Sequence, residues 1–336
     1  GGGMYNDHSS PTVRNVKFAD NRAGMEAGGM FNLCSSPVIE NSVFDSNVSY
    51  AGSGMFNDQG SSPVMRNVSF TGNLGKYGAG IYNRNSSPVI TNALFASNYT
   101  GSYGNGGAAF DENSNTVYTN ATFSGNTGLN GGALACGTPG MESSLTQLNN
   151  CIFWGNTANA EGNEIYIYNT NISVEMNYSC YSNTSGDITV VSGTFTAVNN
   201  NITSDPLFVN PSGGDYRISG ESPCVNSGDN SYNSDSYDIG GRERIQYSTI
   251  DRGAYEWTTT DPVNLVPPSE MTIVRGENSS QLDWTAVPGT SSYSIYRSAD
   301  PYAGFTQIGT SATSSFTDSE VLAGNKYFYY VIAVSG

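Results

Sequence analysis

Positive charge is scarce in this chain. Its 336 residues include 13 lysine and arginine residues against 29 acidic residues, and the formal net charge is −16. Such a surface repels nucleic-acid phosphates and anionic lipid head groups, so we expect no nucleic-acid partner. No stretch approaches the roughly 20 consecutive apolar residues of a membrane helix, so we expect no direct membrane insertion either.

Histidine and cysteine are also sparse. His8 is the single histidine and lies in a turn without a second histidine or an aligned cysteine, so we interpret it as solvated rather than as a metal ligand. Five cysteines cannot all pair within one chain. Aligned on the repeat, Cys180 lies an estimated ~8 Å from Cys151, beyond the usual Cα separation of a disulfide. We therefore expect mostly free, buried thiols at Cys34, Cys136, Cys151, Cys180 and Cys224.

What the chain has in abundance is a repeat. A Phe-x-x-Asn unit recurs at spacings of 26, 26, 25, 28 and 30 residues. Such self-similarity is typical of a solenoid, in which each unit buries its apolar side chains by stacking on its neighbours. Each unit carries three short strands separated by turns that contain asparagine. The sequence thus predicts an all-β fold, a right-handed parallel β-helix with three strands per coil of about 25–30 residues.

Two columns of this repeat are predicted to be structural ladders. The phenylalanines should stack along the interior, where burying each contributes roughly 1.5–3 kcal/mol. Asparagine tolerates a left-handed turn, and its amide can bond the equivalent amide one coil away. The ladder residues are Phe18, Phe44, Phe70, Phe95, Phe123 and Phe153, with Asn15, Asn41, Asn67, Asn92, Asn120 and Asn150.

A third column could carry function. Met4, Met30, Met55 and Ile81 each precede an aromatic residue, and adjacent strand residues point to opposite faces unless a bulge intervenes. If the methionines face inward, an aromatic ladder faces solvent and offers a ligand or assembly surface. The alternatives are a bulge or a covering loop. The aromatic residues are Tyr5, Phe31, Phe56, Tyr82 and Phe110.

Charged residues yield weaker site candidates. Arg14, Glu40 and Arg66 share an outward column, where an acid between two arginines favours salt pairing over a catalytic base. No carboxylate cluster has the register of an active site, so we expect no catalytic residues. Asp229, Asp235, Asp238, Asp251 and Glu256 could hold calcium, although acids that form turns are the simpler interpretation, and we expect no cofactor.

Two parts of the chain resemble known families. Residues 1–256 resemble the secreted right-handed parallel β-helix repeat proteins of bacterial cell surfaces, most specifically in the run from Asp205-Pro-Leu-Phe208 to Asp251-Arg-Gly-Ala-Tyr-Glu256. The pairing of Gly-Gly-Ala-Ala (106–109) with Phe-x-x-Asn is similar to the repeats of chlamydial polymorphic outer-membrane adhesins. The resemblance implies surface display and does not imply a reaction.

The end of the chain resembles a fibronectin type III domain, a small immunoglobulin-like β-sandwich. Trp284, Tyr293, Tyr296 and Tyr327 match its core tryptophan, central strand and tyrosine corner. We expect a β-helix with a C-terminal cap over residues 1–257, a linker over 258–268 and the sandwich over 269–336 without its last strand. Both abrupt ends, at Gly1 and Gly336, favour a fragment of a longer polypeptide.

The predicted function is that of a non-catalytic protein, extracellular or at the cell surface, with an adhesive or structural role. A subunit of an extracellular filament or surface assembly is one form that this role could take. Its expected partners are further copies of itself or a surface polysaccharide. The alternative is a polysaccharide-active lyase or glycosidase, or a carbohydrate-binding module, for which the aromatic column would be the stacking face. An enzyme requires converging acids or a base in a groove, whereas assembly requires a face buried against another copy.

Overall fold

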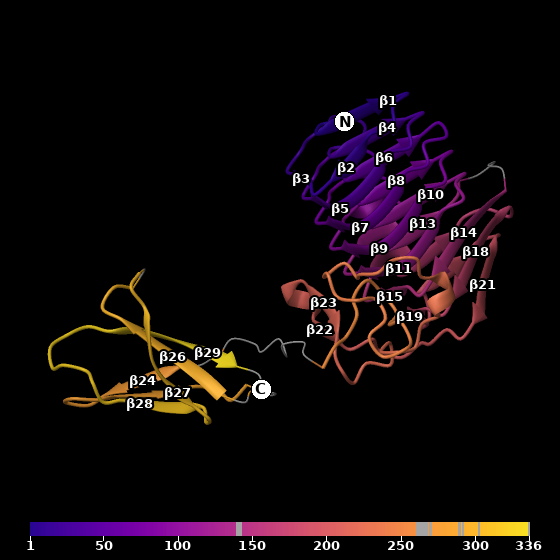
Figure 1. Cartoon of the computed structure of the whole chain (residues 1–336). Coiled ribbons are helices and arrows are strands. Elements are labelled where there is room, and N and C mark those ends of the chain that lie inside the picture. The colour runs from indigo at the N-terminus through magenta and orange to yellow at the C-terminus, as the bar shows by residue number, and fades with distance from the viewer. Residues whose placement is uncertain are drawn as a thin grey trace. The chain divides into compact units, whose positions relative to one another are not determined.

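A computed structural model describes residues 1–138, 143–259, 268, 271–287, 290, 292–301 and 303–334. The chain divides into two compact units, Gly1–Thr258 and Thr259–Gly336 (Figure 1). Most of the linker predicted over 258–268 lies outside the described residues. Among the residues that are described, no helix is long and apolar enough to cross a membrane.

The first unit is a parallel β-solenoid of about seven turns, which confirms the all-β solenoid prediction. One side of every coil joins an eight-stranded parallel sheet, here called sheet 1. Its strands follow one another in chain order, each paired in register with the next coil. They are β1 (Met4–Asp7), β4 (Met30–Leu33), β6 (Met55–Asp58), β8 (Ile81–Arg84), β10 (Ala109–Glu112), β13 (Leu134–Cys136), β17 (Ile165–Ile167) and β20 (Ile188–Val190).

A second parallel sheet, sheet 2, runs along another side of the coils. Its longest strands bend at an asparagine with positive φ, such as Asn41 at 49° and Asn67 at 52°, which asparagine tolerates better than most residues. Its strands are β2 (Thr12–Arg14), β5 (Val38–Asp45), β7 (Val64–Thr71), β9 (Val89–Ala96), β11 (Val117–Ser124), β14 (Ser144–Asn149), β18 (Ile172–Asn177) and β21 (Thr194–Asn199), with β3 (Lys17–Ala19), β15 (Ile152–Trp154) and β19 (Cys180–Tyr181).

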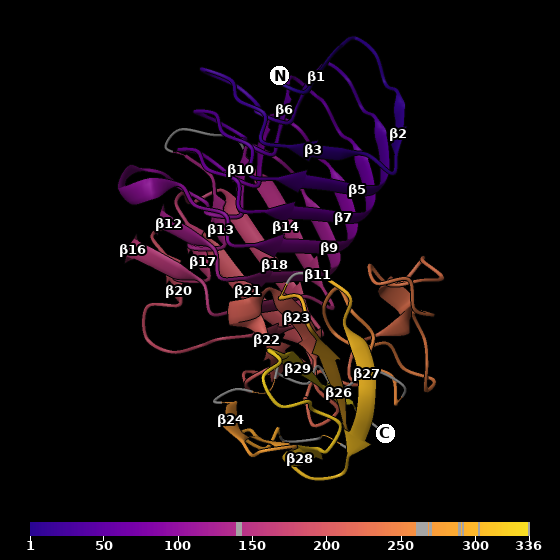
Figure 2. The ribbon, with the colours of Figure 1, turned by 90° about the vertical axis from the view of Figure 1, so that its left-hand side faces the viewer.

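The third side of the coils contains few regular β-strands. Single parallel bridges join successive coils, among them Val48 to Leu74 and Ala51 to Tyr77. Only β12 (Thr127–Asn130) and β16 (Thr157–Glu161) form a two-stranded sheet there, on a different side from β5, β7 and β9 (Figure 2). The short 3-10 helix η1 (Gly101–Tyr103) also belongs to this side.

The interior of the solenoid is a continuous stack of phenylalanine rings. Consecutive rings from Phe18 to Phe153 lie with centroids 4.3–5.0 Å apart and nearly parallel planes. Met30, Met55 and Ile81 of sheet 1 face the same core. The strand spacing of a parallel sheet sets this ring separation, so the stack follows from placing one Phe per coil.

Two ladders of asparagine amides run through the coils beside this core. In the first, which spans Asn21, Asn47, Asn73, Asn98, Asn126 and Asn156, each Nδ2 donates to Oδ1 one coil further on, at 2.8–3.0 Å. It ends where Asn156 donates to Glu164 Oε2 at 2.5 Å. The second ladder runs through Asn6, Asn32, Asn57 and Asn83 and ends on Asp111 Oδ1 at 2.7 Å.

Both ladders therefore end on a buried carboxylate. Asp111 also accepts from the hydroxyls of Tyr118 and Thr146, and the next residue of its column is Cys136, which offers no amide oxygen. Burial raises the pKa of Asp111 to about 6 and the pKa of Glu164 to about 7. A carboxylate accepts several donors and donates none when ionised, so it suits the terminal position of a one-way chain of donors.

The Glu164 carboxyl predicts a pH-dependent stability. Its pKa in the folded state lies above its ordinary value, so the native state binds this proton more tightly than the unfolded state does. The stabilisation is complete below about pH 4.5 and is lost as the pH rises through 7, with a size of about 3 kcal/mol. Glu164→Gln should show a flatter profile, and urea unfolding at pH 5 and pH 8 measures the difference. Parallel profiles for the two proteins would contradict this assignment.

Residues 205–258 lie against the side of the solenoid. Within them, β22 (Phe208–Asn210) and β23 (Asp215–Ile218) form a hairpin, and η2 (Pro211–Gly213) and η3 (Asn230–Tyr232) are short 3-10 helices. The sequence predicted a cap here. The segment instead contacts several coils of sheet 2, from Arg66, which pairs with Asp235, to Ser179, whose carbonyl accepts from Arg252.

The cysteine alignment expected from the repeat is wrong by one residue. Cys180 pairs with Ile152, because Tyr178 takes the left-handed turn position that Asn150 occupies one coil earlier. Cys151 therefore faces the main core, whereas Cys180 belongs to a separate apolar cluster on the outer side. All five cysteines are thiols in this structure, four of them buried.

The described residues of the second unit form two antiparallel sheets of three strands each. One contains β24 (Thr272–Arg275), β25 (Ser280–Asp283) and β28 (Ser315–Asp318). The other contains β27 (Thr306–Ser311), β26 (Ser292–Ser298) and β29 (Phe328–Val334). Leu282, Trp284, Tyr293 and Ile295 form a buried cluster contributed by both sheets.

Candidate functional site

The aromatic column of sheet 1 is mostly covered. Its rings stack with centroids 4.8–5.3 Å apart, and they point away from the main core, opposite to the methionines. Tyr5 is 51% exposed, but Phe31, Phe56, Tyr82 and Phe110 are buried. The prediction that the aromatic ladder faces solvent is therefore wrong for these four residues. They are covered by chain, as in the covering-loop alternative.

Glycines on the third side of the coils turn the chain so that it covers the aromatic column of sheet 1. Gly52, Gly78 and Gly106 have φ between 51° and 67°, and they turn the chain onto the aromatic column. A Cβ on Gly52 would lie 2.7 Å from the Cβ of Phe56, closer than real side chains approach. Only a glycine fits there, because both the positive φ and the close approach exclude other residues.

Between this cover and the column lies a cavity of about 210 Å³, the tyrosine cleft. Phe56 extends from β6, whereas Tyr82 and Arg84 extend from β8. The third side of the coils contributes two tyrosines, and the ring of Tyr50 lies 5.6 Å from that of Tyr77 in an edge-to-face contact. The complete lining is Met25, Glu26, Tyr50, Ala51, Phe56, Tyr77, Tyr82 and Arg84.

Charged groups border these rings. Arg84 forms a bidentate pair with Asp58, at 3.0 and 2.5 Å, and its guanidinium lies 5.0 Å from the Phe56 ring centre. Lys76 Nζ lies 5.3 Å from the ring centres of both Tyr50 and Tyr77. Hydrogen bonding to Tyr50, with Tyr77 beside it, raises the pKa of Lys76.

A second carboxylate lies behind the cleft. The Tyr82 hydroxyl donates to Glu112, which also accepts from Thr138 at 3.0 Å. Burial raises the pKa of Glu112, although the hydrogen bond from Thr138 opposes the shift. Asp58 and Glu112 are thus engaged by neighbouring side chains, whereas Glu26 lines the cleft itself. The cleft offers ring faces and hydrogen-bonding groups, which together suit a ligand with apolar faces and hydroxyl edges.

The sequence interpretation missed most of this cleft. Tyr50, Tyr77 and Arg84 fall outside the columns that the repeat made obvious. One signal was available, since Gly-Ser-Gly at 52–54 and Gly-Ala-Gly at 78–80 immediately precede the aromatic column. Paired glycines before a strand indicate a close backbone approach, here onto the rings.

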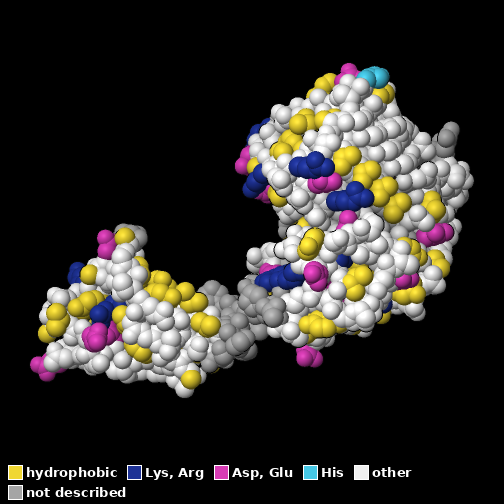
Figure 3. Space-filling view, in the orientation of Figure 1, with side chains coloured by type: hydrophobic (Ala, Val, Ile, Leu, Met, Phe, Trp, Pro, Cys, Tyr) yellow, Lys and Arg dark blue, Asp and Glu magenta, His cyan; other side chains and the backbone are white. Residues whose placement is uncertain are grey.

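The remaining charged candidates form ion pairs. Arg14 pairs with Glu40 at 2.6 Å, Lys17 with Asp45 at 2.9 Å, and Arg66 with Asp235. On the face that Figure 3 draws, basic and acidic side chains lie side by side. The exposed His8 ring contacts Asp7.

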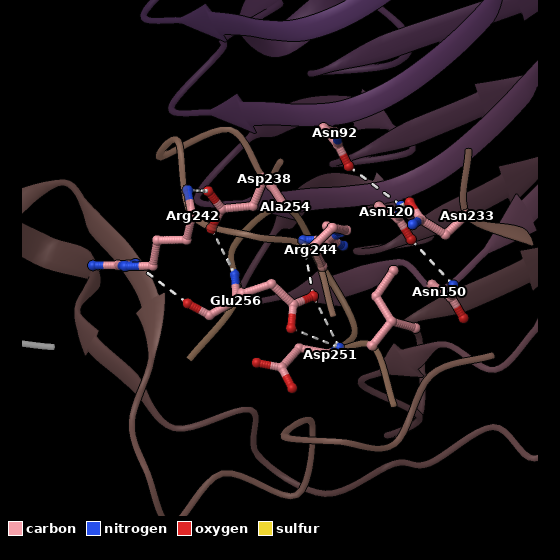
Figure 4. A network of polar contacts seen from close by, with 12 residues as sticks. Asn92, Asn120, Asn150, Asn233, Asp238, Arg242, Arg244, Asp251, Ala254 and Glu256 are labelled. Carbon is pink, nitrogen blue, oxygen red and sulfur yellow. Dashed lines mark hydrogen bonds and ion pairs between the residues drawn. The ribbon is translucent and has the colours of Figure 1, made fainter. Parts of the chain in front are cut away.

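The acids of residues 205–258 mainly hold the backbone. Asp238 accepts from the main-chain N–H groups of Arg242 and Glu256, and Glu256 accepts from that of Asp251 (Figure 4). Arg244 is fully buried and lies 3.3 Å from Glu256. Burial raises the pKa of Glu256, and Arg244 opposes that shift. No group of three His, Cys, Asp or Glu residues in the described part of the chain is placed to hold a metal ion.

The predicted column of turn asparagines, at the bends of sheet 2, contacts residues 205–258 as well. Its amides bond one another from Asn150 back to Asn41. In addition, Asn92 donates to the carbonyl of Tyr237, Asn120 to Asn233, and Asn150 to the carbonyl of Asp229. Figure 4 shows the three asparagines in a row beside the segment. The column therefore joins coils and also attaches residues 205–258.

Comparison with known proteins identifies only parts of the chain. A family model described as "Domain of unknown function (DUF5123)" matches residues 113–231, less than half of the chain. The chain is also similar to a solved Fn3-like protein from Clostridium thermocellum, at 35% identity over 21% of this chain and 77% of that one, with a TM-score of 0.21. A TM-score this low does not establish a shared fold. No curated protein matches the sequence.

Proposed function

We propose that this is a non-catalytic extracellular protein that binds a neutral surface polysaccharide in the tyrosine cleft. The observation that carries the proposal is the combination of Tyr50, Tyr77 and Tyr82 with the Arg84–Asp58 pair around one cavity. Sugar rings present apolar faces to aromatic side chains and hydroxyl groups to charged ones. The excess of acidic residues disfavours polyanionic chains.

The non-catalytic role follows from how the nearby acids are used. Asp58 is committed to Arg84, and Glu112 is committed to Tyr82 and Thr138. General acid catalysis needs a carboxyl that can reach the scissile bond. Glu26 lines the cleft, but glycoside hydrolysis ordinarily uses a pair of carboxyls, and the two neighbouring carboxyls are engaged, which supports binding without cleavage. The stacked interior supports a solenoid that acts as a stiff carrier.

We further propose that the solenoid is right-handed, as in the cell-surface repeat proteins that it resembles, and that the second unit is a fibronectin type III sandwich. Trp284 packs edge-on against Tyr293 at 5.1 Å in its core. The Tyr327 hydroxyl accepts from the Leu322 N–H, five residues upstream, at 3.4 Å, which supports a tyrosine corner. An adhesive surface protein would use such a module as a spacer.

Replacing Tyr50 tests the binding proposal. Its ring is 45% exposed, so Tyr50→Ala should leave the fold intact. Loss of one stacking ring should weaken binding about tenfold, which corresponds to about 1.4 kcal/mol. Affinity electrophoresis in gels containing xylan, glucomannan or polygalacturonate measures retardation of the wild-type protein and the variant.

The matched control is Tyr103→Ala, at a tyrosine that is 80% exposed and does not line the cleft. Retardation by a neutral polysaccharide, reduced in Tyr50→Ala and unchanged in Tyr103→Ala, is the expected result. Equal retardation of all three proteins would refute the proposal that the polysaccharide binds in the tyrosine cleft. Release of new reducing ends from any polymer would refute the non-catalytic role.

A further inference from the structure

Cys180 and Cys224 come from distant parts of the chain and meet in one apolar cluster. Cys180 lies on β19 of the solenoid, whereas Cys224 lies in the segment 205–258 packed on its side. Both are fully buried together with Ile152 and Ile218. The Cys224 thiol is the largest influence that raises the pKa of the Cys180 thiol, which also donates from Sγ to the carbonyl of Ser204 at 3.2 Å. No other cysteine belongs to this cluster of described residues.

One arginine fixes the spacing of the two backbones. The main-chain N–H of Arg252 donates to the carbonyl of Cys224 at 3.1 Å. Its Nη1 donates to the carbonyl of Ser179, the residue before Cys180, at 2.8 Å. The Cys224 N–H is held as well, by Ser222 Oγ at 3.1 Å. The cysteines are therefore presented to each other by rigid, hydrogen-bonded turns.

We propose that Cys180 and Cys224 form a disulfide bond that fastens residues 205–258 to the side of the solenoid. Disulfides persist in oxidising compartments, so the cross-link is consistent with the extracellular location in the proposed function, but it does not depend on the tyrosine cleft. The bond closes a loop over residues 181–223 and restricts the unfolded chain. The segment then cannot detach from the coils while the bond is intact.

The oxidant is a low-molecular-weight disulfide such as glutathione disulfide. One cysteine thiolate attacks it, forms a mixed disulfide and displaces one glutathione thiolate. The second cysteine thiolate attacks the protein sulfur of that mixed disulfide and displaces the second glutathione. Two protein thiols lose two electrons and two protons, and one glutathione disulfide becomes two glutathione thiols. Because both thiols are buried, the exchange occurs while the chain folds.

Thiol counting tests the bond on the full chain. The protein is refolded with a mixture of reduced and oxidised glutathione, and its thiols are then titrated in denaturant. Of the five cysteines, three should react in the wild-type protein and all five after dithiothreitol. Cys224→Ser should show four reactive thiols with or without reductant. Cys34→Ser, the matched control at a half-buried cysteine outside the cluster, should show two before reduction and four after.

Peptide mapping identifies the partners. Cleavage after arginine and glutamate separates residues 176–217, whose single cysteine is Cys180, from residues 222–242, whose single cysteine is Cys224. Mass spectrometry without reduction should find these two peptides joined. Thermal unfolding should show a melting temperature about 5–10 °C higher for the oxidised than for the reduced wild-type protein, and no such difference for Cys224→Ser.

Five reactive thiols after refolding, a stable glutathione adduct, or a link from Cys224 to any other cysteine would overturn the proposal. Failure of saccharide binding would leave these measurements unchanged, because they contain no ligand. The two proposals can therefore fail separately.

Discussion

Phe95→Ala should destabilise the solenoid by about 3–5 kcal/mol. The Phe95 ring is fully buried and lies 5.0 Å from Phe70 and 4.6 Å from Phe123, with nearly parallel planes. Tyr118 contacts its edge. Alanine would remove two stacked contacts and leave a cavity that neighbouring coils cannot close, because their backbone spacing is fixed by the sheet.

Guanidinium unfolding of the first unit measures this loss. Phe95→Leu provides a second variant if the alanine variant does not fold, since leucine keeps most of the volume but loses both stacking contacts, and it should cost about 1–3 kcal/mol. Tyr103→Ala, at an exposed ring, should change stability by less than about 0.5 kcal/mol. A Phe95→Ala variant as stable as Tyr103→Ala would show that the stack contributes little.

Asn98→Ala should be nearly as costly, at about 4 kcal/mol. Asn98 donates from Nδ2 to Asn126 and to the carbonyl of Phe70, and its Oδ1 accepts from the backbone and side-chain amides of Asn73. Removing the amide breaks four buried hydrogen bonds at once, each worth about 1 kcal/mol. Asn126 Oδ1 keeps the bond from the main-chain N–H of residue 98, and Asn73 Nδ2 keeps its bond to the carbonyl of Phe44.

The control for this substitution is Asn199→Ala. Asn199 is exposed and donates one hydrogen bond, to Asn177. Its loss should cost less than about 1 kcal/mol in the same unfolding experiment. If the two variants lose equal stability, the interior position of the amide ladder is not what makes it stabilising.

The repeat made the solenoid predictable because stacking is periodic. One phenylalanine and one turn asparagine per coil place the core and the bends wherever the spacing holds, and β5, β7, β9 and β11 follow that spacing. Period alone also indicated that Met30 and Phe31 point to opposite faces. These conclusions depend only on strand alternation and on stacking of equal units.

The cover and the cleft could not be derived in that way. Whether Phe56 is exposed depends on the direction in which the chain turns at Gly52. That direction is set by one φ angle and not by the spacing of the repeat. The contact between Cys180 and Cys224 crosses the repeat boundary, so no spacing connects the two residues. The one-residue error at Cys180 has the same origin, because a tyrosine took the turn position of an asparagine.

Asp111 and Glu164, the buried carboxylates that end the two interior asparagine ladders, limit how this solenoid can change length. Upstream of Asp111, every interior asparagine passes its hydrogen bond to an identical neighbour, so a whole coil could be inserted or removed there without leaving a donor unpaired. Beyond Asp111 that column contains Cys136, and an added Asn coil would have no donor to its carbonyl oxygen. Coils that carry this asparagine can thus be added or removed only before Asp111, and the coils past it, beginning with the one that contains β13, carry other residues in that column.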